Sequence, residues 1–172
     1  ALLAVPASAQ LDKLKLSETI QSIKFSGDIR LRDDLSERRG AAAANDRGSL
    51  RYRLRFGPEI ELPDNLAAVI RLGSGTGEQV STNQSYDNLS GQKQIWIDLM
   101  NLRWKPVIHD DAKAAVHTGR MANPLWRIYS SDIVWDDDFN PEGFGENFEW
   151  VFADAGLSVF ANGLQAVADE DS

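Results

Sequence analysis

Apolar and polar residues alternate strictly over residues 49–62, SLRYRLRFGPEIEL. Every even position from Leu50 to Leu62 is apolar, whereas the odd positions carry three arginines, two glutamates, a serine and a glycine. Successive side chains of a β-strand point to opposite faces, so this pattern predicts a strand with one apolar and one charged face. The run exceeds the ~5–6 residues of an ordinary globular strand and satisfies the about 9–11 residues that a tilted strand needs to cross a bilayer. The sequence therefore predicts a transmembrane β-strand.

The period of two recurs in other segments. It predicts further strands over residues 23–33, 66–73, 94–105 and 112–119, with two more near residues 148–152 and 156–162. Within residues 94–105 the apolar positions change from odd to even. A one-residue β-bulge near Leu99–Met100 would keep both halves of this strand on one apolar face.

The connections between these strands alternate in length. Residues 33–48, 74–93 and 119–147 form long loop-like segments, whereas the turns near Asp64 and His109 are short. This alternation is typical of an outer-membrane barrel, with long extracellular loops and short periplasmic turns. A soluble sandwich or lipocalin-like barrel is the alternative, but its dry core would leave so many arginines without partners. We expect an all-β fold, an antiparallel transmembrane β-barrel or the N-terminal part of one.

The start of the chain predicts export. Residues 1–9 end in Ala7-Ser8-Ala9, which has the form of a signal-peptidase site, so we interpret them as a signal-peptide remnant. A disordered alanine-rich terminus is the alternative. Residues 10–22 are expected to form a short tether or helix. Residues 23–172 form the predicted barrel region, which we expect to be incomplete because six or seven strands are visible and single-chain bacterial barrels begin at about eight.

Composition excludes several functional classes. The net charge of −8 argues against a nucleic-acid binder, and the absence of cysteine excludes disulfides and thiolate zinc sites. The two histidines, His109 and His117, lack the spacing of a nucleophile–base pair. We therefore expect no enzyme, no cofactor and no metal.

Several segments resemble the putative-porin family of Gram-negative outer membranes. They include FSGDIRLR (residues 25–32), RYRLRFG (51–57), STNQSYDNLSGQKQIWIDL (81–99), HTGRMANPLW (117–126) and IVWDDDFNPEG (133–143). The resemblance implies a signal peptide, a β-barrel and passive solute diffusion, and it brings no catalytic residues. Family barrels are much longer than this chain, which also lacks the terminal aromatic residue typical of outer-membrane barrels.

Two charged sets are candidate functional residues. A basic ladder occupies the polar face of three consecutive predicted strands and is expected to line a pore: Arg30, Arg32, Arg51, Arg53, Arg55 and Arg71. An acidic set in the third long segment is expected to form a constriction loop opposite the ladder: Asp132, Asp136, Asp137, Asp138 and Glu142. The alternatives are local charge pairing for the ladder and a calcium loop for the acidic set. The calcium loop is disfavoured because Pro141 stands where that loop needs glycine.

These observations predict an outer-membrane porin, a water-filled channel for passive diffusion of small hydrophilic solutes and ions. The alternative is an outer-membrane structural barrel that anchors the envelope. The expected partners are outer-membrane lipid, small hydrophilic solutes and ions, without nucleic acid, and a homo-oligomer such as a trimer is left open.

Overall fold

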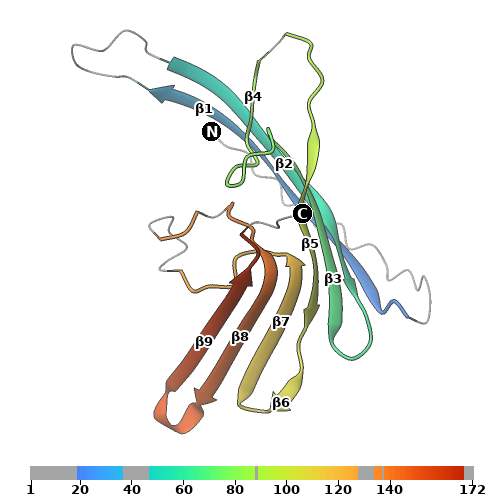
Figure 1. Ribbon diagram of the computed structural model, residues 1–172, viewed down its shortest axis with the longest axis vertical. Helices are drawn as coiled ribbons and strands as arrows, with labels where there is room; N and C mark the ends of the chain where they lie inside the picture. Colours follow the sequence, from blue (N-terminus) through green and yellow to red (C-terminus); the bar gives the residue numbers. More distant parts are fainter. Residues whose placement is uncertain (1–18, 37–46, 88, 128–133, 137, 169–172) are drawn as a thin grey trace.

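The computed structural model describes residues 19–36, 47–87, 89–127, 134–136 and 138–168, and most of them belong to one antiparallel β-sheet (Figure 1). Its long strands pair in the order β1-β2-β3-β5-β7-β8-β9, so each long strand pairs with the next long strand along the chain. Their bounds are β1 Ser22–Ser36, β2 Arg47–Glu61, β3 Leu66–Ser74, β5 Ile95–Trp104, β7 Ala112–Arg120, β8 Glu142–Phe152 and β9 Leu157–Ala166. Two short strands, β4 (Gln84–Ser85) and β6 (Val107–His109), pair with β2 and β7.

The predicted all-β, antiparallel fold is therefore confirmed. Among the described residues, no strand pairing joins β1 to β9, so the sheet is open. An open sheet of this kind is consistent with part of a barrel wall. The predicted loop at residues 119–147 extends too far towards the C-terminus. Strand β8 already begins at Glu142, and it pairs along its length with both β7 and β9. Within the described residues, no helix is long and apolar enough to span a membrane.

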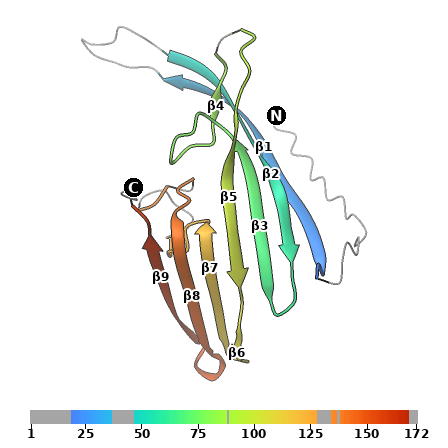
Figure 2. The same ribbon diagram turned by 45° about the vertical axis from the view of Figure 1, so that its right-hand side comes forward.

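Long and short connections leave the sheet at opposite ends. The tight turns at Leu62–Asn65 and η1 (Ala153–Ala155) lie at one end, while the β3–β5 and β7–β8 loops lie at the other (Figures 1 and 2). Asp64 and Asn65 both have φ of 60°, the conformation that a tight two-residue hairpin requires. The predicted turn at Asp64 is thereby explained by local backbone geometry.

The phase slip in β5 corresponds to a β-bulge. Arg71 pairs with Leu99 and the next residue, Leu72, pairs with Ile97, so Asp98 is the extra residue. The predicted bulge is confirmed, but it lies one residue earlier than expected. Its consequence is that Asp98 and Leu99 are both buried, whereas Ile97 and Met100 remain exposed on the apolar face. Placing Leu99 on the lipid face was therefore wrong.

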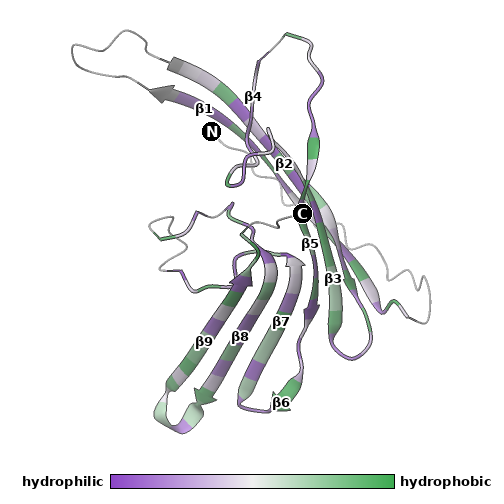
Figure 3. Ribbon diagram, viewed as in Figure 1, coloured by the Kyte–Doolittle hydropathy of each residue, from purple (hydrophilic) through white to green (hydrophobic). Residues whose placement is uncertain are grey.

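Each strand has an apolar and a polar face, visible as alternating colours in Figure 3. We call the face with Phe25, Ile29, Phe56 and Met100 the outer face, and the face with the arginine ladder the inner face. Burial is reversed relative to a soluble protein. Ile29 on the outer face is 76% exposed, whereas the Arg53 side chain on the inner face is only 15% exposed. Such an arrangement is stable where the outer face meets hydrocarbon and the inner face meets polar groups and water.

Candidate functional site

The arginine ladder forms a continuous patch on the inner face of β1, β2 and β3. In the β1–β2 ladder, Arg30 lies directly opposite Arg53, and Arg32 lies directly opposite Arg51. Like charges in directly opposed positions repel each other, so such pairs need counter-charges or water. The surrounding contacts show which arginines receive them.

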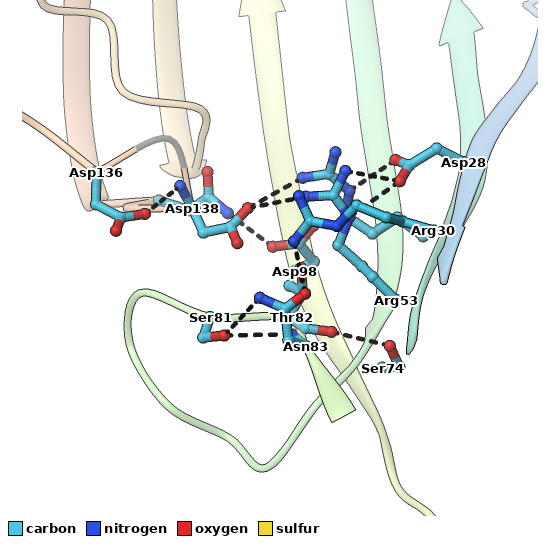
Figure 4. A network of polar contacts seen from close by, with 12 residues as sticks. Asp28, Arg30, Arg53, Ser74, Ser81, Thr82, Asn83, Asp98, Asp136 and Asp138 are labelled. Carbon is cyan, nitrogen blue, oxygen red and sulfur yellow. Dashed lines mark hydrogen bonds and ion pairs between the residues drawn. The ribbon is translucent and has the colours of Figure 1, made fainter. Parts of the chain in front are cut away.

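Two carboxylates hold the middle of the ladder, one from the sheet and one from a loop (Figure 4). Asp28 on β1 accepts hydrogen bonds from Arg53 Nε at 3.0 Å and Arg55 Nε at 2.8 Å. Asp138, in the β7–β8 loop, lies 3.2 Å from Arg55 Nη1 and 3.8 Å from Arg53 Nη1. Asp28 and Asp138 therefore flank Arg53 and Arg55 from two sides, and the loop reaches across the inner face to do so.

A second cluster centres on the bulged residue Asp98, whose side chain is 3% exposed. Its carboxylate accepts hydrogen bonds from Arg71 Nε at 2.5 Å and from Asn140 Nδ2 at 2.7 Å. Its backbone carbonyl accepts a hydrogen bond from Arg120 Nε at 3.1 Å. Because Asn140 belongs to the β7–β8 loop, Asp98 fastens that loop to the sheet wall.

The β3–β5 loop also reaches the ladder. Arg30 Nη2 donates a hydrogen bond to Asn83 Oδ1 at 2.6 Å, and Asn83 is itself held by the Ser81 hydroxyl. The same loop is fixed to the sheet by the β4–β2 pairing and by a hydrogen bond from Ser74 Oγ to the Thr82 carbonyl. Two loops therefore meet the arginine patch from the same face of the sheet.

Packing brings the β7–β8 loop close to β8 and β9. Trp126 packs on Phe160 of β9 with ring centroids 6.1 Å apart, and Asn147 Nδ2 donates a hydrogen bond to the Pro124 carbonyl at 2.8 Å. A Cβ at Gly145 would lie 2.8 Å from Met121 Sδ and 2.9 Å from Pro124 Cγ. The close approach of this loop to β8 therefore depends on the missing side chain at position 145.

The predicted acidic residues are placed differently from one another. Asp138 contacts the ladder, whereas Asp136 is exposed and accepts a hydrogen bond from the Asp138 amide. Glu142 is the first residue of β8, and it forms an ion pair with Arg120 at 3.1 Å. Asp132 and Asp137 lie outside the described residues.

The six arginines also separate into groups. Arg53 and Arg55 share the carboxylates of Asp28 and Asp138. Arg71 belongs to the Asp98 cluster. The Nε atoms of Arg32 and Arg51 lie 2.7 and 3.5 Å from the Asp34 carboxylate. Sequence reasoning missed four residues of the site: Asp34, Asp98, Asn140 and Asn83. The phase slip in β5 was a signal for Asp98, whereas the two asparagines stand in aperiodic loops.

The contacts of the acidic set do not resemble a calcium loop. Asp138 faces arginines, and Asn140 directs its amide towards Asp98. Within the parts of the chain that the structure describes, no three acidic or histidine side chains are grouped so that they could hold a metal ion.

An open antiparallel sheet with an apolar exposed face, and a charged face covered by loops, defines the wall of a membrane β-barrel. The family model described as "Putative porin" matches residues 40–167, about three quarters of the chain. The chain belongs to this family, which implies a membrane location. No curated protein matches the sequence.

Proposed function

We propose that this protein forms a water-filled channel in the outer membrane for passive diffusion of small hydrophilic solutes and ions. The observation that carries the proposal is the reversed distribution of polarity between the two faces of the sheet. Ion-paired arginines and carboxylates gather on the inner face, while the outer face exposes residues such as Ile29 and Leu31. A charged inner face of this kind suits contact with water and dissolved ions.

The β7–β8 loop narrows the channel in this proposal. Its Asp138 meets Arg53 and Arg55, its Asn140 meets Asp98, and Trp126 packs on the wall at Phe160. These contacts lie on three different strands, so the loop spans the inner face from β2 to β9. Carboxylate and guanidinium groups that face each other across a lumen set up a transverse field, which orients dipolar solutes and disfavours apolar ones.

The family and the contacts of the site both favour a channel without catalysis. Family membership suggests a non-enzymatic role. The carboxylates of Asp28, Asp98 and Asp138 on the inner face are engaged by arginines rather than by a nucleophile or a general base. The competing function is an anchoring barrel without a conducting lumen. Such a barrel would give no conductance steps in a planar lipid bilayer.

The test is single-channel recording of the full-length protein in a planar lipid bilayer. We expect discrete conductance steps, and larger steps after deletion of residues 127–139, which removes Asp138 and keeps Asn140 and β8. The matched control deletes the exposed residues 89–92 of the β3–β5 loop and should leave conductance unchanged. Absence of conductance in folded protein would reject the channel, and unchanged steps after the 127–139 deletion would reject the narrowing role of the loop.

A further inference from the structure

We propose that the ladder contains a binding site for a small oxyanion, centred on Arg30. This inference rests on the proposed channel function, since it names the class of solute that the inner face favours. The starting observation is an imbalance of charge. Among the described residues, five guanidinium groups, those of Arg30, Arg32, Arg51, Arg53 and Arg55, gather around three carboxylates, those of Asp28, Asp34 and Asp138.

Each of these carboxylates is already divided between two arginines. Asp28 and Asp138 both bridge Arg53 and Arg55. Asp34 bridges Arg32 and Arg51. Among the described residues, Arg30 has no carboxylate within ion-pair distance, and the side-chain partner recorded for it is the neutral amide oxygen of Asn83.

The position of Arg30 makes this lack of a counter-charge costly. It lies directly opposite Arg53, and the next inner-face pair along the two strands is Arg32 opposite Arg51. The Arg30 Nε atom is buried without a hydrogen-bond partner among the described residues, whereas Arg51 Nε, also buried, lies 3.5 Å from the Asp34 carboxylate. An uncompensated guanidinium charge among like charges favours the arrival of an acceptor that carries negative charge.

The donor geometry of the Arg30 guanidinium group favours an oxyanion over a halide. Guanidinium is a planar donor that matches carboxylate and phosphate oxygens in pairs, which a spherical halide cannot exploit. Because the Nε atoms are enclosed, the anion would bind through the Nη groups of the half-buried Arg30 side chain. The whole chain carries a net charge of −8, so the bulk charge of the protein does not account for anion binding at this place.

The experiment measures binding of inorganic phosphate to the full-length protein in detergent, by phosphorus NMR line broadening and by titration calorimetry. We expect binding to the wild type and about tenfold weaker binding to Arg30→Gln, the loss expected for one charge-assisted hydrogen-bonded pair. Arg103→Gln is the matched control, because Arg103 lies on the inner face and is already paired with Glu59. It should leave the affinity unchanged within about twofold. Arg30→Lys keeps the charge and removes the planar fork, so it should bind phosphate more weakly than the wild type.

Several outcomes would overturn the site. No phosphate binding to the wild type would do so. Equal losses of phosphate affinity in Arg30→Gln and Arg103→Gln would mean general attraction of anions by the inner face. Full phosphate affinity in Arg30→Lys would mean that a positive charge alone suffices. Conductance is recorded on the same preparations. Phosphate binding without conductance would reject the channel and keep the site, whereas conductance without binding would reject the site and keep the channel.

Discussion

Removing the Asp98 carboxylate tests whether the bulge in β5 fastens the β7–β8 loop to the wall. In Asp98→Ala, Arg71 loses its ion pair and the buried amide of Asn140 loses its acceptor. Breaking a fully buried pair costs about 3–5 kcal/mol. The Arg71 side chain is 27% exposed and can recover some hydration, so we expect the free energy of unfolding to fall by about 2–4 kcal/mol.

Asp98→Asn separates shape from charge. The amide oxygen can still accept from Arg71, and the amide of Asn140 can turn to pair with the new side chain. The hydrogen bonds then lack the strengthening that a charged acceptor gives, so we expect the free energy of unfolding to fall by about 1–2 kcal/mol. Asp154→Ala, an exposed carboxylate in η1, should change stability by less than about 0.5 kcal/mol and serves as the control.

The assay is urea unfolding of the full-length protein in lipid vesicles, followed by tryptophan fluorescence. A double-mutant cycle with Asn140→Ala completes it. If Asp98 acts partly through Asn140, the double variant should lose less than the sum of the two single variants. A loss below about 0.5 kcal/mol in Asp98→Ala, or a strictly additive cycle, would refute the fastening role of the bulge.

Three further predictions follow from the faces of the sheet. Met100→Arg places a charge on the exposed outer face and should destabilise the protein by about 2–4 kcal/mol in vesicles if Met100 lies near the bilayer midplane, measured by urea unfolding. Asp138→Asn frees the charges of Arg53 and Arg55 and should raise the permeability of anions relative to cations, read from the reversal potential in a salt gradient; a shift towards cations would contradict it. Gly57→Ala would put a Cβ 2.0 Å from the Ile70 carbonyl oxygen and force β2 away from β3, so the free energy of unfolding should fall by about 1–3 kcal/mol. A Cβ at Gly73 would lie 3.2 Å from its nearest neighbour, the Thr82 methyl, so Gly73→Ala should lower the free energy of unfolding by less.

The strands were predictable because one face of each must be apolar along its whole length. That requirement leaves a period of two in the sequence, and β1, β2, β3, β5 and β7 were found from it. The start of β8 was not, since neither face of residues 142–147, EGFGEN, is uniformly apolar: one face carries Glu142, Phe144 and Glu146, and the other carries two glycines and Asn147. Their strand conformation comes from pairing with β7 and β9, which no local pattern records.

The candidate site was predictable only in part, for a related reason. The arginines follow the strand period, so their common face could be deduced from the sequence. The residues that meet them come from loops without a period, and Asn83 lies 53 residues from Arg30. Asp98 was an intermediate case. The sequence indicated a bulge, but its position within β5 depends on the pairing with β3, which places Arg71 against Leu99 rather than Asp98.

The absent side chain at position 145 has a consequence for how such a channel can diversify. Met121 Sδ and Pro124 Cγ lie only 2.8 and 2.9 Å from the place that a Cβ at this position would take, so the size of this residue sets how near the loop lies to the wall. Alanine is one nucleotide substitution away from glycine, and it would displace the loop without altering a single charge. In the proposed channel, aperture and electrostatic character are thereby encoded at separate positions, so selection could adjust the size limit for solutes and leave the charge preference in place.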